Sequence, residues 1–92
     1  MNRNPTARKA LGRVLRRWRE EMGVSQERFA HLADFDRTYI GAVERGTKNL
    51  SFEGLWQFLR ALGRTWTDLG KALDKEPALK GKPVTRPKHH PG

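Results

Sequence analysis

The sequence predicts an all-α protein, a compact bundle of four to five short helices. Apolar residues recur at helical spacing in several stretches of the chain. Most of these stretches begin after a capping residue or end at a glycine. No stretch alternates apolar and polar residues for long enough to form a strand. With 92 residues, the chain has the size of one small domain.

The first helix is expected over residues 6–22. Pro5 stands before it and Gly23 follows it, which are typical start and stop signals. One of its faces is apolar, and the opposite face is rich in arginine. The apolar face consists of Leu11, Val14, Leu15, Trp18 and Met22. We expect this face to pack on the core and the arginines to remain at the surface.

Two shorter helices are expected over residues 26–33 and 37–45. Ser25 and Asp36 are suitable N-caps, and Gly46 is a suitable stop. The link between the two helices is too short for anything but a tight turn. Two short helices joined in this way, within a basic all-α domain, are typical of a helix-turn-helix that binds DNA.

A fourth helix follows the loop at residues 46–49. Ser51 is its expected cap, and Gly63 ends it. Its apolar residues lie at i, i+3, i+4 and i+7: Leu55, Phe58, Leu59 and Leu62. A weaker fifth segment is expected over residues 67–73.

We divide the chain into a flexible N-terminus at residues 1–5, a helix-turn-helix domain at residues 6–74 and a flexible basic tail at residues 75–92. The tail contains four of the five prolines and few apolar residues. Such a segment cannot bury enough apolar surface to offset the entropy lost on ordering. The folded part that remains is small, which favours oligomerisation.

The net charge of +9 is concentrated at the two ends of the chain. Residues 1–20 contain seven Lys and Arg against one acid, and residues 71–92 contain six against two. The middle of the chain is nearly neutral. A basic excess favours polyanionic partners, above all nucleic acid. A membrane span would need roughly 20 apolar residues, and neither such a run nor a secretory signal is present, so we expect a cytoplasmic protein with no membrane partner.

The residue pattern gives no sign of catalysis or of a cofactor. The chain has no cysteine, which excludes disulfides and thiolate metal sites. His31 has no potential metal ligand at helical spacing, and His89 and His90 lie in the tail, so no metal site is expected. There is also no phosphate-binding glycine loop. We therefore expect a binding protein, not an enzyme.

Five motifs occur in order along the chain: S-Q-E-x-F-A at 25–30, D-R-T-Y-I at 36–40, V-E-R-G at 43–46, S-F-E-G-L at 51–55 and L-x-A-L-G at 59–63. With them, the chain from Leu11 to Leu69 resembles the Cro/C1-type (XRE) helix-turn-helix regulators. The D-R-T-Y-I-x-x-x-E-R-G form is similar to the controller proteins of restriction–modification systems. The resemblance implies a phage-repressor-like fold and a bacterial or phage-encoded regulator that binds double-stranded DNA sequence-specifically and lies on the nucleoid when bound.

One stripe of the third helix is expected to face DNA. The candidate base contacts are Arg37, Thr38, Gly41 and Ala42. Arg37 can donate two hydrogen bonds to guanine, although a phosphate contact or a solvated side chain is the alternative. Gly41 costs roughly 1 kcal/mol in a helix interior relative to alanine. Either the helix backbone approaches the duplex there, or the glycine avoids a clash with a neighbouring helix.

The resemblance also implies phosphate contacts from Gln26, Tyr39, Arg45, Thr47 and Lys48. For Tyr39, a role in supporting the fold remains open. Arg19 and Glu44 match a buried structural ion pair of phage repressors, and the alternative is two exposed side chains. Asp34 occupies a turn position where the family often has glycine, so the shape of the turn is open as well.

The aromatic residues also leave two interpretations. Phe52, Trp56, Trp66 and Leu69 either complete a small core or form a dimer interface, since regulators similar to this chain commonly dimerise there. A two-fold dimer would bind a palindromic operator and could regulate its own gene. The alternative function is an antitoxin that represses its own operon and binds a partner toxin through its tail. Only Leu79 and Val84 would then serve as apolar anchors.

Overall fold

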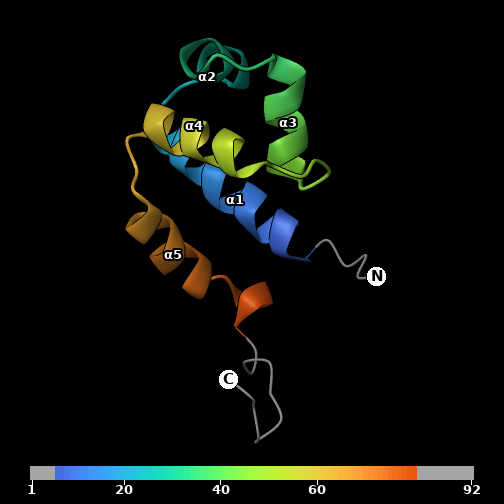
Figure 1. Cartoon of the computed structure of the whole chain (residues 1–92), viewed down its shortest axis with the longest axis vertical. Helices are drawn as coiled ribbons and strands as arrows, with labels where there is room; N and C mark the ends of the chain where they lie inside the picture. The colour runs from blue at the N-terminus through green and yellow to red at the C-terminus, as the bar shows by residue number, and fades with distance from the viewer. Residues whose placement is uncertain (1–5, 81–92) are drawn as a thin grey trace, which may run out of the picture.

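The computed structural model describes residues 6–80, which form five α-helices, a short 3₁₀-helix and no strand (Figure 1). The expectations for residues 1–5 and for most of the tail lie outside the described part. The α-helices are α1 (Thr6–Glu21), α2 (Gln26–Ala33), α3 (Arg37–Arg45), α4 (Phe52–Leu62) and α5 (Trp66–Asp74), and η1 (Pro77–Leu79) follows them. The predicted all-α class is confirmed.

Side-chain caps fix where the helices begin. The Ser25 and Ser51 hydroxyls accept hydrogen bonds from backbone N–H groups at 3.0 and 2.9 Å, and the Asp36 carboxylate accepts one at 3.1 Å. The start of α5 differs from the prediction, because Trp66 is its first residue and not part of the preceding loop. Thr65 and Asp68 form a reciprocal capping box there. The backbone N–H of Thr65 donates to the Asp68 carboxylate and thereby lowers its pKa.

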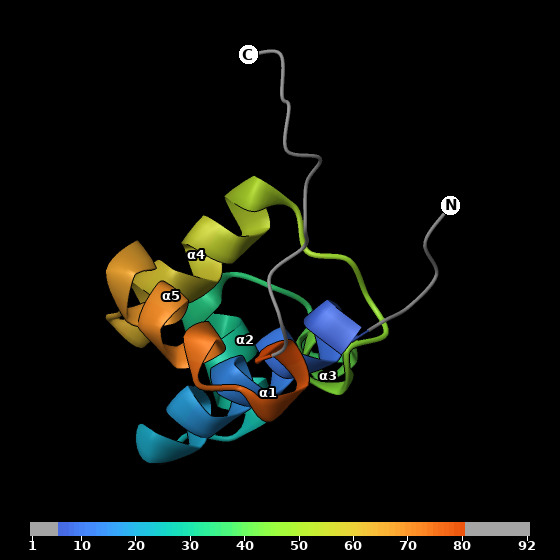
Figure 2. The ribbon, with the colours of Figure 1, turned by 90° about the horizontal axis from the view of Figure 1, so that it is seen from below.

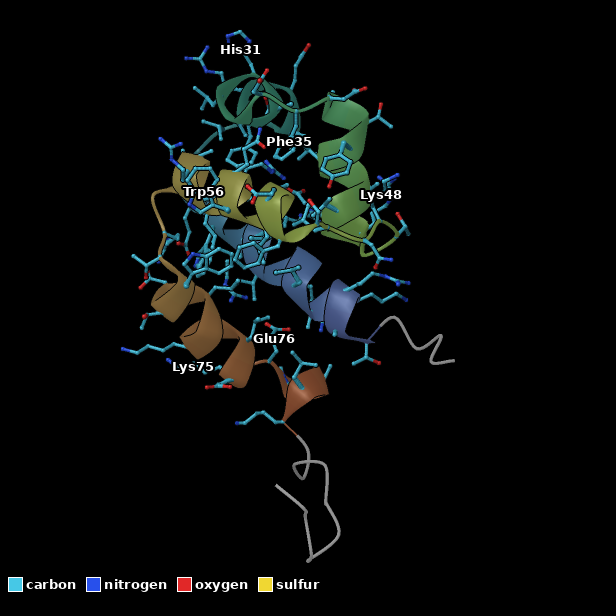
Figure 3. All side chains as sticks on the ribbon, viewed as in Figure 1. His31, Phe35, Lys48, Trp56, Lys75 and Glu76 are labelled. Atoms are coloured by element: carbon cyan, nitrogen blue, oxygen red, sulfur yellow. The ribbon has the colours of Figure 1, made fainter. Side chains whose placement is uncertain are left out.

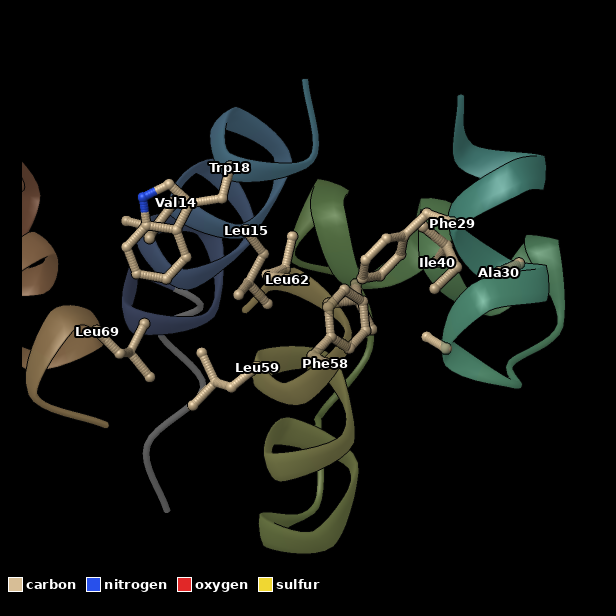
Figure 4. Packing of buried hydrophobic residues seen from close by; sticks show 12 residues of the cluster. Val14, Leu15, Trp18, Phe29, Ala30, Ile40, Phe58, Leu59, Leu62 and Leu69 are labelled. Atoms are coloured by element: carbon tan, nitrogen blue, oxygen red, sulfur yellow. The ribbon is translucent and has the colours of Figure 1, made fainter. Parts of the chain in front are cut away.

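Helix α1 lies between α3 and α5 (Figures 1 and 2), and α4 covers the core from a third side. Figure 4 shows the core that these helices enclose. Phe29 and Phe58 are fully buried, with ring centroids 5.3 Å apart. Phe35, in the turn before α3, packs on the same Phe58 ring at 5.3 Å. The aromatic core thus holds α2, the turn and α4 together beneath α3.

The backbones of α1 and α3 are in direct contact at Gly12. A Cβ atom added to Gly12 would lie 2.6 Å from the carbonyl oxygen of Val43 and closer still to that of Glu44. Backbone atoms of a packed helix cannot move aside to make room. Glycine is therefore required at this crossing. The sequence does not indicate this constraint, because Gly12 is not one of the residues of the predicted apolar face.

The boundary of the tail is corrected by the structure. Residues 75–80, predicted as part of the flexible tail, pack against α1 through η1. The buried Glu76 carboxylate pairs with Arg13 at 3.0 Å and with Arg17 at 3.7 Å (Figure 3). Leu79, one of the two apolar anchors of the antitoxin interpretation, ends this 3₁₀-helix, and Val84 lies outside the described residues.

Candidate nucleic-acid interface

Helix α3 presents a polar stripe to solvent, within which Gly41 is buried and Ala42 is half-buried. Ile40 and Val43 are buried, so the helix can face outward only with the opposite side. On that side Arg37, Thr38 and Arg45 are exposed. The Asp36 cap begins the helix, and Gly46, at φ 77°, ends it. The stripe therefore offers guanidinium and hydroxyl donors on a rigid element with both ends fixed.

The turn between α2 and α3 forms without a glycine. Asp34 adopts the left-handed conformation at φ 61° and ψ 47°, which caps the end of α2. The backbone N–H of Phe35 then donates to the carbonyl oxygen of Ala30 at 2.8 Å. Aspartate tolerates this conformation better than most residues, although at a cost that glycine does not have. The tight turn therefore forms with aspartate at the position where related regulators often have glycine.

Gly41 is buried beneath the side chains of Arg45 and Gln26, and it does not face the backbone of a neighbouring helix. A Cβ atom there would meet Nη1 of Arg45 at 3.0 Å and Oε1 of Gln26 at 3.5 Å. Nη1 of Arg45 is the end of a flexible, exposed side chain that can shift, and 3.5 Å from Gln26 is an ordinary van der Waals contact. Of the two interpretations of this glycine, the clash with a neighbouring helix is therefore not supported by the packing.

Arg19 and Glu44 meet as a buried pair that joins α1 to α3. The Arg19 guanidinium donates from Nε to Oε2 at 2.6 Å and from Nη2 to Oε1 at 3.0 Å. Its Nη1 donates to the carbonyl oxygen of Val24 at 2.7 Å. The hydrogen bond to Glu44 raises the pKa of Arg19. The side chain of Gln26 joins the pair, because Nε2 donates to Oε1 of Glu44 at 2.9 Å.

The other candidate phosphate contacts lie around the C-terminal end of α3 and the loop that follows it. Lys48 is exposed in this loop (Figure 3). Thr47 is exposed too, and its hydroxyl donates to the carbonyl oxygen of Ala42 at 3.2 Å. The sequence pattern does not predict that Arg8 contacts this loop. Arg8 donates hydrogen bonds to Gly46 O and to Asn49 Oδ1, both at 3.2 Å. The contact with Gly46 spans 38 residues of sequence, so no local pattern indicates it.

Tyr39 packs into the fold. Its ring lies against Phe35 with the centroids 5.0 Å apart, and burial raises the pKa of its hydroxyl. The hydroxyl oxygen lies close to Gly54, near the start of α4. These contacts support a structural role for the ring of Tyr39.

Three aromatic side chains form an exposed surface on α4 and α5, which we call the aromatic surface: Phe52, Trp56 and Trp66. They are 71%, 43% and 41% exposed. Phe52 stacks on Trp66 at 4.9 Å, with the ring planes 6° apart. Together with Glu53 they line a groove of about 360 Å³. Leu69 does not belong to this surface: it is 5% exposed and packs in the core, so its assignment to a dimer interface is wrong.

Within residues 6–80 there is no group of three or more His, Asp or Glu side chains that could hold a metal ion. His31 is exposed on α2, and His89 and His90 lie outside the described residues. None of the helices in the described part is long and apolar enough to cross a membrane.

Comparison with known proteins shows consistent similarities. A model of the helix-turn-helix family matches residues 15–69, which include all of α2, α3 and α4. Control protein C.MunI of a Mycoplasma species is 38% identical over 67 residues, which is 72% of this chain and 90% of that protein.

Solved structures give the same result. The restriction–modification controller protein C.Esp1396I, solved as a tetramer in complex with its natural 35-base-pair operator, is 30% identical with a TM-score of 0.72, over 76% of this chain and 92% of that one. The clp gene regulator ClgR of C. glutamicum is 31% identical with a TM-score of 0.71, over 76% of this chain and 90% of that one.

Proposed function

Because this chain belongs to the helix-turn-helix family and is a DNA-binding transcriptional regulator, we propose that it acts as a homodimer on a two-fold symmetric operator. It would do so in the bacterial cytoplasm, without catalytic activity, and would control its own gene. The observation that supports this most directly is the exposed stripe of α3, which is capped at both ends and backed by buried Ile40 and Val43. A helix presented in this way fits the major groove.

We assign base recognition to the first two turns of α3. The guanidinium of Arg37 can donate to both O6 and N7 of one guanine, and Thr38 can hydrogen-bond a base or touch a thymine methyl group. Ala42 can offer only its methyl group. Gly41 is buried beneath Arg45 and Gln26, so a base contact at Gly41 would require these side chains to move aside. Sequence preference would then depend on a short, nearly neutral part of a strongly basic chain.

Phosphate contacts would fix the orientation of α3 without reading sequence. We assign this role to Gln26 at the start of α2, where free backbone N–H groups also favour an anion. Arg45, Thr47 and Lys48 would contact the backbone at the other end of α3. The hydroxyl of Tyr39 could add one further contact beside its structural role.

The aromatic surface is the proposed dimer interface. A contiguous group of exposed aromatic side chains is costly to leave in water, and aromatic residues are enriched at interfaces. A two-fold contact between the α4–α5 surfaces of two copies would be self-complementary and closed. It would place two α3 helices about one DNA turn apart, as a symmetric operator requires.

The decisive experiment selects bound duplexes from a random DNA pool and measures the affinity of variants for the selected sequence. The selected sequence should be two-fold symmetric. Arg37→Ala should lose about 1–3 kcal/mol on this sequence and relax the preference at one base position per half-site. Lys71→Ala removes an exposed cation on α5, on the other side of α1 from α3, and is the control. Equal losses on the selected and on random DNA would exclude base reading by Arg37.

A further inference from the structure

The side-chain amide of Gln26 is held in one orientation. Its partner, Glu44, is a carboxylate that accepts hydrogen bonds and donates none. The nitrogen of the amide, not its oxygen, must therefore face Glu44, which is the arrangement of the 2.9 Å contact. The amide has a second N–H and a carbonyl oxygen, and neither has a hydrogen-bond partner among residues 6–80.

Glu44 is itself buried and held by hydrogen bonds. Its side chain is 2% exposed, that of Arg19 is 9% exposed, and two hydrogen bonds join them. Arg19 also binds the carbonyl oxygen of Val24, two residues before α2 begins. One buried group of charges therefore connects α1, α3 and the segment that leads into α2. Among the ion pairs of residues 6–80, the one to which Gln26 is attached is the pair with both side chains buried.

The unpaired half of the amide lies beside the outward stripe of α3. Oε1 of Gln26 is 3.5 Å from the position of a Cβ atom on Gly41, so the amide occupies space that a side chain at Gly41 would share. Gln26 is also the first residue of α2, where backbone N–H groups point away from the helix. Gln26 is half-buried, so its side chain reaches the surface that we assign to DNA.

We propose that Glu44 is a positioning residue for DNA binding: together with Arg19, it directs the free Nε2–H of Gln26 toward a phosphate oxygen of the bound duplex. This inference rests on the proposed function. It gives the buried ion pair a second role, beyond joining α1 to α3. Neither residue of the pair would touch DNA itself.

The test removes the pair without leaving a buried charge. Replacing both Arg19 and Glu44 by Met substitutes apolar groups of similar volume, a change that proteins often tolerate without loss of stability. We expect the double variant to unfold at the wild-type temperature and to bind the selected operator about ten- to a hundredfold more weakly, the effect of one lost hydrogen bond to a charged group. Gln26→Met should give the same loss, and adding it to the double variant should give no further loss.

Two readouts separate positioning from a general structural role. Because Gln26 is neutral, its contact releases no counterion, so the salt dependence of binding should not change. The matched control is Glu21→Met with Arg64→Met, which removes an exposed ion pair of 2.9 Å that joins α1 to the segment after α4, and it should leave operator affinity unchanged. Normal operator binding by the folded Arg19–Glu44 double variant would overturn the proposal. The proposal would also be overturned if Gln26→Met reduced operator affinity equally in the wild type and in the double variant.

A second measurement needs no variant of the pair. In the NMR spectrum of the wild-type protein, adding operator should shift the Gln26 amide proton that does not face Glu44. The proton that faces Glu44 should stay in place. If neither proton responds to operator that binds specifically, the positioning proposal is wrong while the proposed function stands. If the wild-type chain selects no DNA sequence at all, the proposed function itself is wrong.

Discussion

Two glycines on the contacting helices α1 and α3 have different surroundings, and we expect opposite effects from substituting them. Gly41→Ala should keep the fold and raise the free energy of unfolding by up to about 1 kcal/mol, because alanine favours a helix and the one tight contact is with the flexible end of Arg45. It should also weaken operator binding, because the added methyl group displaces the guanidinium of Arg45, which we assign to a phosphate contact. Chemical denaturation and a DNA titration measure the two effects.

Gly12→Ala provides the contrast. Its methyl group would overlap backbone oxygens of α3, so this variant should lose about 1–3 kcal/mol of stability, as overpacking typically costs. If Gly41→Ala also lost about 1–3 kcal/mol of stability, Gly41 would be required for helix packing and not for DNA binding.

Substitution of Asp34 should increase the stability of the fold. Asp34→Gly should raise the free energy of unfolding by about 1 kcal/mol, because glycine adopts φ 61° without steric cost and because a carboxylate is unfavourable at the C-terminal end of α2. Two further variants separate these causes. Asp34→Asn removes only the charge, and its smaller gain should disappear at high salt. Asp34→Ala removes the charge but keeps the strain, so an equal gain from alanine would contradict the role of the backbone conformation.

At the scale of the elements, the capping box makes the stability of α5 depend on pH. Hydrogen bonding to Thr65 lowers the pKa of Asp68 in the folded state, so this carboxylate stabilises the fold above its ordinary pKa of about 3.9. The stabilisation is lost as the pH falls through the lower folded value. Asp68→Asn should therefore be less stable than wild type at neutral pH, and the difference should disappear in acid.

Urea unfolding measured from pH 7 down to pH 2 checks this prediction. Asp74→Asn is the control, because it removes an acid at the opposite end of the same helix, where a carboxylate caps nothing. A constant difference between wild type and Asp68→Asn over the whole pH range would contradict the assignment.

The elements that the sequence predicted correctly are those with local signals. Ser25, Asp36 and Ser51 are capping residues directly before apolar periodic segments, and the structure confirms all three caps. Two misses required knowledge of distant contacts. Leu69 is buried because α5 packs against α1, and the attachment of Gln26 to Glu44 joins residues 18 apart in sequence. The start of α5 at Trp66 had a local signal, the pair Thr65 and Asp68, which the apolar pattern alone does not reveal.

For the whole molecule, the aromatic surface predicts an association that depends on concentration. Phe52→Ser combined with Trp66→Ser should keep the monomer fold, because neither side chain belongs to the buried core. The double variant should weaken dimerisation strongly, since central aromatic residues of an interface often contribute about 2 kcal/mol each. Sedimentation equilibrium measures the mass, and operator binding should weaken in parallel.

The control for this variant is Leu32→Ser, which removes an apolar side chain that is 48% exposed on α2, outside the aromatic surface. It should leave the association unchanged. A wild-type chain that stays monomeric at all concentrations, with or without operator, would contradict the proposed interface.

The positions of the three tryptophans have a practical consequence for spectroscopy. Trp18 is buried beneath the guanidinium of Arg64, whereas Trp56 and Trp66 face solvent on the aromatic surface. The emission of Trp18 is therefore already that of an apolar environment and has little reason to change when two copies associate. A blue shift of intrinsic fluorescence with rising protein concentration would then come from Trp56 and Trp66 alone. The chain thus contains its own reporter of assembly and needs no attached dye.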